Sequence, residues 1–346
     1  MTSVISSAGA HAALPGRSGR ATVSVVLSFR NEAGNIAPLV SRLDAMFARE
    51  DVEYELLFVN DASTDESLAI LIHERERNAR VKILNMSRRY GVAEGVLAGM
   101  AAATGDAVVY MDADLQDPPE IIPALLARWR GGADVVHTVR TRRHGERALK
   151  IWATRLAYRI IHSGSTLELP VEAGDFKLLS RTATDHLLRL RESDPYLRGL
   201  IVWLGFNQTF VPYERDARHA GRTHFPFFSK NPWKTFALGL TSFSFLPIYA
   251  CIVLAAVAAL VSMLFAIAGL AMFVAGSPPG GWMILIALVG FSWATIVGAI
   301  GAVGIYVARI YKDVRGRPPY IVGSTIGLSS AVESRFAEAR EERIHS

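Results

Sequence analysis

The sequence predicts an α/β fold with a mostly parallel β-sheet, followed by a hairpin of two transmembrane helices. Two observations lead to this prediction. Between residues 22 and 140, apolar runs of strand length alternate with segments of helical periodicity, which is typical of a parallel sheet covered on both faces. From Thr235 through Ala308 the chain contains no Asp, Glu, Lys, Arg or His, as expected of membrane-spanning segments.

The elements of the first region follow one another in regular order. The expected strands are TVSVVLSF (22–29), YELLFVN (54–60), VKILNM (81–86), DAVVYM (106–111) and ADVVHTVR (133–140). The expected helices cover Asn35–Arg49, a segment that opens at 63–65, about 92–103, Pro119–Trp129 and 146–163. In the first helix apolar residues recur at spacings of three and four, which is the helical period.

Polar residues follow four of the expected strands. They are Asn31, Glu32, Asn60, Asp61, Asp112, Asp114 and Arg140. Ligands of open α/β sheets bind outside the carboxyl ends of the strands, so this pattern predicts a ligand site. The alternative is that polar residues follow strands simply because loops are solvated.

The stretch YMDADLQDPPE (110–120) ends an apolar run with carboxylates that flank a single alanine, Asp112 and Asp114. Like charges at this spacing repel each other. A divalent cation such as Mg²⁺ or Mn²⁺ would neutralise them, since both ions prefer oxygen ligands. The alternative is a solvated turn, because Asp and Pro are common in turns.

The apolar region is interrupted by GSPPGG (276–281), which leaves two segments at about 245–274 and 282–307. Each exceeds the roughly 20 residues that a spanning helix needs. The flanks are rich in Lys and Arg, which marks the cytoplasmic side of a membrane, so both termini and the large N-terminal part are expected in the cytosol. The alternative is a buried helix pair of a soluble protein.

The remaining features bound the organisation of the chain. The net charge of +5 suits work beside anionic lipid, and no motif points to a nucleic-acid partner. With one cysteine, Cys251, no intramolecular disulfide can form. The expected parts are a flexible leader (1–20), a cytosolic α/β domain (21–228), an interfacial juxtamembrane helix (229–242), two transmembrane helices (243–311) and a cytosolic C-terminal tail (312–346).

Ordered motifs resemble a known family. SVVLSFRNEAGNI, ELLFVNDASTD, SRRYGVAEGVLAGMAAATGD and YMDADLQDPPE are similar to the GT-A nucleotide-sugar domain of family 2 glycosyltransferases. HTVRTRRHGE, EAGDFKLLSR, YLRGLIVWLGF and VPYERDARHAGRTHF resemble the subgroup that makes polyprenyl-phosphate sugars, which includes dolichol-phosphate mannose synthase and bacterial bactoprenol glucosyltransferases. The two apolar segments followed by YKDVRGRPPYIV resemble the bacterial branch most, and the resemblance covers about residues 22–323.

The resemblance implies a donor site. Its nucleotide-sugar-binding residues would be Ser28, Asn31, Glu32, Asp61 and Asp112. Asp61 would contact the base or ribose, as the second acid of the family's usual aspartate pair. Asp112, Asp114 and Gln116 would hold Mg²⁺ or Mn²⁺ and the diphosphate, with Asp114 counted as catalytic. Such a metal stabilises the charge of the departing nucleoside diphosphate.

The resemblance also implies an acceptor site for a lipid phosphate. Guanidinium groups bind phosphate through paired hydrogen bonds, and the candidates are Arg140, Arg143, Arg215 and Arg218. The alternative is that these are solvated surface arginines. Asp175 in EAGDF would face the acceptor as a catalytic base or orienting group, and its position between a helix and the next segment predicts a loop.

Several positions depart from the family pattern. Asn60 replaces the first acid of the aspartate pair, and Ser28 replaces a proline. Arg222, Thr223 and His224 stand where relatives have Glu, Ser and Lys. Asn keeps an acceptor but loses the charge, and His carries a positive charge only when protonated.

Together these features predict an inverting, metal-dependent hexosyltransferase. It would move one sugar from a UDP-linked donor, with UDP-glucose as the first candidate, to undecaprenyl or another polyprenyl phosphate at the inner membrane. The resemblance implies a homo-oligomer, a tetramer. The alternatives are a processive polysaccharide synthase of the same fold and a non-catalytic nucleotide-binding membrane scaffold. Two spans and YLRGLIVW in place of a QxxRW motif disfavour the first, and the acids Asp112, Asp114 and Asp175 disfavour the second.

Overall fold

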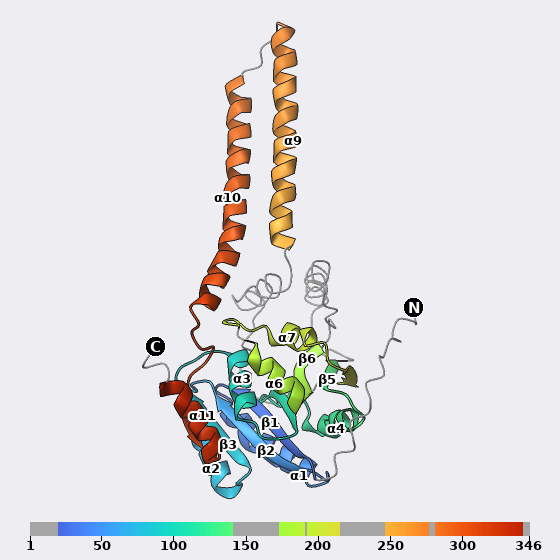
Figure 1. Cartoon of the computed structure of the whole chain (residues 1–346), viewed down its shortest axis with the longest axis vertical. Coiled ribbons are helices and arrows are strands. Elements are labelled where there is room, and N and C mark those ends of the chain that lie inside the picture. The colour runs from blue at the N-terminus through green and yellow to red at the C-terminus, as the bar shows by residue number, and fades with distance from the viewer. Residues whose placement is uncertain (1–19, 141–172, 191, 215–245, 277–280, 342–346) are drawn as a thin grey trace. The chain divides into compact units, whose positions relative to one another are not determined.

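The computed structural model describes residues 20–140, 173–190, 192–214, 246–276 and 281–341. The chain divides into two compact units (Figure 1). The first unit contains residues 1–148, 169–224 and 318–346, and the second contains residues 149–168 and 225–317. The expected helix at 146–163 and the expected juxtamembrane helix at 229–242 lie outside the described residues.

The first unit is built on an eight-stranded sheet of order β7-β5-β6-β4-β1-β2-β3-β8. The strands are β1 (Thr22–Phe29), β2 (Glu53–Asn60), β3 (Val81–Met86), β4 (Ala107–Asp112), β5 (Val135–Arg140), β6 (Ala173–Ser180), β7 (Gln208–Tyr213) and β8 (Val322–Ile326). The pairs β1–β2, β1–β4, β2–β3 and β5–β7 are parallel, whereas β6 and β8 run antiparallel to their neighbours. The predicted α/β class with a mostly parallel sheet is confirmed.

Helices cover both faces of this sheet. They are α1 (Ala33–Phe47), α2 (Ser67–Arg77), α3 (Val92–Ala102), η1 (Pro119–Ile121), α4 (Ile122–Arg130), α6 (Arg181–Arg189) and α7 (Leu197–Trp203). On one face, apolar residues of α1, α2 and α4 join those of β1, β2 and β4 in one buried cluster. On the other face, α3 packs on β1 and β2 and also contacts α6.

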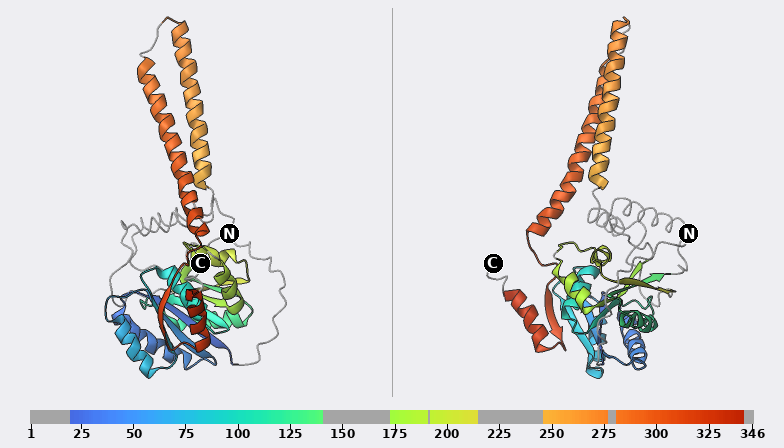
Figure 2. Two further views of the ribbon diagram at one scale, coloured as in Figure 1. Left: turned by 60° about the vertical axis from the view of Figure 1, so that its left-hand side comes forward. Right: turned by 45° about the vertical axis from the view of Figure 1, so that its right-hand side comes forward.

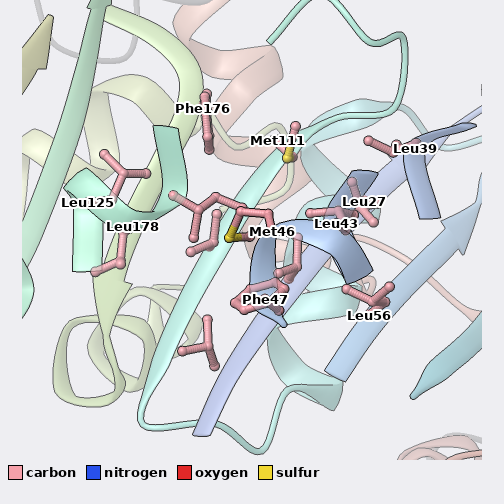
Figure 3. Packing of buried hydrophobic residues seen from close by; sticks show 14 of the residues in the cluster. Leu27, Leu39, Leu43, Met46, Phe47, Leu56, Met111, Leu125, Phe176 and Leu178 are labelled. Atoms are coloured by element: carbon pink, nitrogen blue, oxygen red, sulfur yellow. The ribbon is translucent and has the colours of Figure 1, made fainter. Parts of the chain in front are cut away.

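The buried cluster shows why the alternating pattern was a reliable signal. Leu39, Leu43 and Phe47 of α1 lie on the same helix face and pack over Leu27 and Leu56 of the sheet (Figure 3). Each fully buried side chain of this kind contributes roughly 1.5–3 kcal/mol relative to exposure. The opposite face is covered closely because α3 presents glycine there: a β-carbon at position 99 would lie 2.3 Å from Val26 Cγ1.

The position of Asp175 in the segment EAGDF differs from the expected one. Asp175 was expected in a loop, but it lies in β6, which is inserted antiparallel between β4 and β5. The strand continues through Phe176, Leu178 and Leu179, which are fully buried. Asp175 is compatible with the strand because it lies near the start of β6 and pairs with Arg198.

The C-terminal tail also contributes to the sheet. Strand β8 pairs antiparallel with β3 at the edge of the sheet, and α11 (Ser330–Glu341) follows it. The sequence of β8, VGSTI, is short and of mixed polarity, so it carries no strong strand signal of its own. An unpaired sheet edge is a template for a further strand, and here the end of the same chain fills it.

The second unit contains two long apolar helices that run side by side, α9 (Leu246–Val274) and α10 (Gly281–Val314) (Figure 2). Ile248–Met272 and Leu288–Val314 are long and apolar enough to cross a membrane, with mean hydropathy values of 2.8 and 1.9. Large apolar side chains such as Leu270 and Ile300 are about two-thirds exposed, which is unlike the core helices of a soluble protein. The two predicted helices are present, and α10 extends beyond the expected end at residue 307.

Candidate functional site

Backbone strain gathers at the carboxyl ends of three neighbouring strands. Among the described residues other than glycine, a positive φ occurs at Asn31 (57°), Ala62 (54°) and Leu115 (59°). These residues follow β1, β2 and β4, which are adjacent in the sheet. Such conformations cost free energy for residues with a β-carbon, and they gather at binding and catalytic sites. This edge of the sheet is therefore the first candidate for the functional site.

The loops after β1 and β2 are fastened together by polar contacts. The side chain of Asn31 donates from Nδ2 to Thr64 Oγ1 at 3.2 Å and accepts at Oδ1 from the Thr64 amide at 2.8 Å. Its backbone amide donates to Ser63 Oγ at 3.0 Å. Glu32 is buried and accepts from Asn35 Nδ2 at 2.6 Å, which fixes the start of α1. Asn31 and Glu32 thus shape the edge of the candidate site.

Asn60 and Asp61 end β2 in different environments. Asn60 Oδ1 accepts from the Ser63 amide at 2.9 Å, and its Nδ2 donates to Asn85 Oδ1 at 3.1 Å. Asp61 is buried, and its Oδ1 accepts from the backbone amide of Tyr90 at 2.7 Å. Asp61 is therefore held between the ends of β2 and β3, at the edge where a nucleotide would bind in such a sheet.

The side chain of Ser28 lies against helix α3. Its Oγ is buried without a hydrogen-bond partner among the described residues and lies against α3. A β-carbon at Gly95 of α3 would lie 2.3 Å from this oxygen, so the close approach of helix and strand requires glycine there. The hydroxyl of Ser28 therefore packs against α3.

The three candidate metal ligands lie on one short segment. Asp112 ends β4 and is half-buried, while Asp114 is only 6% exposed. The backbone amide of Gln116 donates to Asp114 Oδ1 at 3.2 Å, and the left-handed Leu115 lies between them. The tight turn at residues 114–116 therefore fixes the direction of the Asp114 carboxylate.

The donor set fits a divalent cation that is completed by a substrate. Within the described residues, no three His, Cys, Asp or Glu side chains gather closely enough to hold a metal ion by themselves. Mg²⁺ is commonly bound by one or two carboxylates, with waters and substrate phosphates filling its remaining positions. Asp112 and Asp114 supply two carboxylates, and Gln116 offers an amide oxygen two residues further on.

On the neighbouring strand, Asp175 forms a paired contact with Arg198 of α7. Arg198 Nε donates to Asp175 Oδ1 at 2.7 Å, and Nη2 donates to Oδ2. Burial alone would raise the pKa of Asp175, but the charges of Arg198, Lys177 and Arg140 outweigh it and hold this pKa well below its usual range. Asp175 is therefore an anion across the physiological pH range. The sequence reading missed Arg198 as a site residue.

Arg140 ends β5 and belongs to the same charged region. Its Nε donates to Tyr213 Oη at 3.1 Å, and its Nη2 lies 3.9 Å from Asp117 Oδ1. Tyr213 in turn donates to Asp117 at 2.5 Å, and burial next to Asp117 raises the pKa of Tyr213 to about 12. A β-carbon at Gly174 would lie 3.2 Å from Arg140 Nη2, so the guanidinium crosses β6 where that strand has no side chain.

A buried lysine lies two residues beyond Asp175 on the same face of β6. Lys177 is 1% exposed, and burial lowers its pKa to about 7. Its partners in register are Tyr110 of β4 and His137 of β5, both buried. Burial and the lysine's charge lower the pKa of His137 to about 4, so this imidazole is neutral at pH 7. No pattern in the sequence marked this row of polar residues.

Register brings the two charged regions together. The antiparallel ladder between β4 and β6 ends at the pair Tyr110–Lys177. Asp112 lies two residues after Tyr110, and Asp175 lies two residues before Lys177, so the two acids flank the same end of the ladder. The charges of Asp112, Asp175 and Arg198 all act on the Tyr110 hydroxyl. The other candidate arginines, Arg143, Arg215 and Arg218, lie outside the described residues.

The chain is similar to known glycosyltransferases. Residues 24–188 match the model of glycosyl transferase family 2. The chain is 37% identical to "Uncharacterized glycosyltransferase YkcC" of Bacillus subtilis (strain 168), over 89% of this chain and 95% of that protein. It is 32% identical to "Bactoprenol glucosyl transferase" of Shigella phage SfII, over 87% of this chain and 97% of that protein.

The similarity to solved structures is weaker than the similarity to these sequences. The chain overlaps with glucosyl-3-phosphoglycerate synthase of Mycobacterium tuberculosis, solved in complex with uridine diphosphate, at 20% sequence identity and a TM-score of 0.46. The overlap covers 64% of this chain and 79% of that chain.

Proposed function

Because the chain belongs to glycosyl transferase family 2, we propose that it transfers one sugar from a nucleotide-sugar donor to a polyprenyl phosphate such as undecaprenyl phosphate, with inversion at the anomeric carbon. The donor is a UDP-linked hexose, with UDP-glucose the first candidate. The name of the similar Shigella phage protein, a bactoprenol glucosyl transferase, supports both the sugar and the prenyl carrier.

The observation that carries this proposal is the arrangement at the ends of β4 and β6. Asp112 and Asp114 follow one strand, while Asp175, Arg198 and Arg140 gather around the adjacent one. A site that joins a diphosphate leaving group to a phosphate nucleophile needs carboxylates for a cation on one side and guanidinium groups on the other. The carboxylates and the guanidinium groups at this edge of the sheet support the proposal.

On the donor side, Asp61 would bind the base or ribose while Asn31 and Glu32 hold the surrounding loops in place. Asp112, Asp114 and Gln116 would hold Mg²⁺ or Mn²⁺. When bound, the ion neutralises charge on the departing nucleoside diphosphate. The turn at residues 114–116 keeps the Asp114 carboxylate in a fixed direction before the donor arrives.

On the acceptor side, a phosphate oxygen would attack the anomeric carbon while the bond from that carbon to the diphosphate breaks. This oxygen is already anionic near neutral pH, so the reaction does not need a strong base. Asp175 suits an orienting role, because Arg198 holds its pKa well below the usual range and a weak base accepts a proton poorly. Arg140 and Arg198 would receive the phosphate, with Arg143, Arg215 and Arg218 as further candidates.

The membrane part fits a lipid substrate. Strands β7 and β8, which lie before α9 and after α10 in the chain, belong to the same sheet. The chain must therefore leave and re-enter the membrane on one side, which requires an even number of spans. The basic residues around the apolar region favour the cytosol for that side. We accordingly propose a multi-pass protein of the cytoplasmic membrane, assembled as a homo-oligomer, with the catalytic domain and both termini in the cytosol.

The test is transfer by the purified full-length protein in lipid. The protein is incubated with Mg²⁺, undecaprenyl phosphate and each of a panel of radiolabelled nucleotide sugars, and the lipids are then extracted. One donor should yield a labelled lipid in which a single sugar is attached through a phosphodiester. Labelled polymer, or turnover that does not depend on the lipid, would overturn the proposal.

A further inference from the structure

A line of hydrogen bonds runs from the C-terminal strand to the loop after β2. Asn85 of β3 donates from Nδ2 to Ser324 Oγ of β8 at 3.1 Å. Asn60 donates from Nδ2 to Asn85 Oδ1 at 3.1 Å, and the Ser63 amide donates to Asn60 Oδ1 at 2.9 Å. The Asn31 amide then donates to Ser63 Oγ at 3.0 Å. The line connects the ends of β8, β3, β2 and β1, four strands in spatial order.

The bonds all have the same polarity along the line, since each member accepts from the next member on the side away from Ser324. Chains of this kind polarise one another and strengthen each bond. Asn60 is central, because its amide donates to Asn85 and accepts from Ser63. A carboxylate at position 60 could accept but not donate. The structure therefore explains why an amide suits position 60, which the sequence alone did not explain.

The line fixes the part of the chain that carries Asp61. The contact from the Ser63 amide to Asn60 Oδ1 closes a turn around Asp61 and Ala62, and Ala62 has a φ of 54°. Such an Asx-type turn depends on the rotamer of the asparagine. The Asn60 rotamer depends on Asn85, and the orientation of the Asn85 amide depends on Ser324.

We propose that Ser324, acting through Asn85 and Asn60, is a positioning residue of the donor site, so that the strand following the apolar hairpin helps to shape the nucleotide-binding loop. The inference rests on the proposed function, because it takes Asp61 as a nucleotide contact. Ser324 does not touch the substrate. It sets the geometry of the loop that does.

Strand β8 remains attached when Ser324 is changed. The Ser87 amide donates to the Ile321 carbonyl at 3.0 Å, and the ladder pairs Ile83 with Ile326 and Leu84 with Thr325. Ser324→Ala therefore removes one side-chain contact and leaves the backbone pairing in place. Ser324→Thr keeps the hydroxyl and serves as the rescue variant.

The matched control lies one residue further along the same strand. Thr325 Oγ1 donates to Glu333 Oε1 of α11 at 3.1 Å and takes no part in the line to Asn60. Thr325→Ala also removes one hydroxyl from β8, but its contact leads to the C-terminal helix. Any general weakening of the tail should appear in both alanine variants.

The experiment compares nucleotide binding by the full-length variants in lipid nanodiscs. Calorimetry measures the dissociation constant of UDP with Mg²⁺, GDP being used in a parallel arm, and steady-state assays measure KM for the donor and for undecaprenyl phosphate. Ser324→Ala should weaken UDP binding and raise donor KM by roughly two- to tenfold, the range expected for loss of one hydrogen bond. Acceptor KM should stay constant, and Ser324→Thr should bind like the wild type.

A double-mutant cycle tests the route of the effect. In an Asn85→Ala background, Ser324→Ala should produce no further change in UDP affinity, because the line is already broken. Equal effects of Ser324→Ala and Thr325→Ala, or normal UDP affinity in Ser324→Ala, would overturn the inference while leaving the proposed function intact. A wild type that binds neither UDP nor GDP would overturn the proposed function and the inference with it.

Discussion

The two halves of the sheet edge are built from different chemistry. Around β1, β2 and β3 the loops are joined by neutral amides and hydroxyls, with Asn31, Asn60 and Asn85 in a continuous set of hydrogen bonds. Around β5, β6 and β7 the contacts are ionic, and Asp175 pairs with Arg198 while Arg140 lies near Asp117. The first region, which we call the neutral frame, is joined by these amides and hydroxyls, although Glu32 and Asp61 also accept hydrogen bonds there. The second region is a cluster of opposing charges.

This difference indicates which region is complete without a ligand. Hydrogen bonds between neutral groups satisfy their donors and acceptors, so these groups need no counter-ion. Among the described residues, the charged network pairs Asp175 with Arg198 and brings Arg140 near Asp117, and the buried Lys177 lies on the same strand as Asp175. Buried charge is costly unless it is balanced, and the lowered pKa of Lys177 reflects that cost.

The largest expected effect is on the donor side of the site. Asp114→Asn should lower transfer about a hundredfold or more while leaving the fold intact, because the metal would lose one of its two carboxylates. Turnover assays with the purified variant measure this. Asp51→Asn, which changes an exposed acid away from the strand ends, is the matched control. Full turnover in the presence of EDTA would contradict the metal role.

The second largest expected effect tests whether the two regions serve different substrates. Asp175→Asn should lower transfer roughly ten- to hundredfold, the range for losing a charge-assisted contact, because Arg198 is no longer held by an anion. Calorimetry with UDP and Mg²⁺ should give a dissociation constant close to that of the wild type. A collapse of UDP affinity would place Asp175 on the donor side and remove the distinction between the halves.

A third change tests the cation that ends β5. Arg140→Ala should raise KM for undecaprenyl phosphate about tenfold, with donor KM unchanged, because a phosphate contact is lost. Arg140→Lys should restore only part of the affinity, since an ammonium cannot reproduce paired guanidinium contacts. Tyr213→Phe serves as a comparison, because it keeps the charge of Arg140 and removes the hydroxyl that accepts from Arg140 and donates to Asp117. A rise confined to donor KM would assign Arg140 to the diphosphate.

The neutral frame and the charged cluster also differ in how far the sequence predicted them. Strands β1 to β5 were placed within a residue or two, because each is an apolar run that signals itself. The residues after β1, β2 and β4 were found by the same route, since a strand end is visible in the sequence. Strands β6, β7 and β8 were missed, because their pairing with strands that are distant in the chain decides them, and β8 lies farthest from its partner β3.

Partners that meet only in the folded chain could not be predicted in the same way. Asp175 and Arg198 are separated by 23 residues, and the separation of Asn85 and Ser324 is 239 residues. Nothing local in YLRGL marks Arg198 as the partner of a particular acid. Lys177 reads as an ordinary polar residue of EAGDFKLLSR, and only its burial between Tyr110 and His137 reveals its unusual state.

The smallest effect concerns stability and follows from Lys177. Its pKa is about 7 in the folded protein, whereas an unfolded lysine has a pKa near 10.4. Between these values the unfolded state binds more protons than the folded state, so this residue makes the free energy of unfolding rise with pH. Below pH 7 both states are protonated, and the cost of burying the cation is fully present.

Lys177→Met removes this dependence, because methionine fills similar space without a proton to lose. Thermal unfolding of the wild type and the variant is compared at pH 6, 7.5 and 9. The melting temperature of the wild type should rise relative to that of Lys177→Met as the pH increases, with most of the gain above pH 7. A difference in melting temperature between the two proteins that stays constant over this pH range would contradict the prediction. It would mean that Lys177 keeps its positive charge in the folded protein.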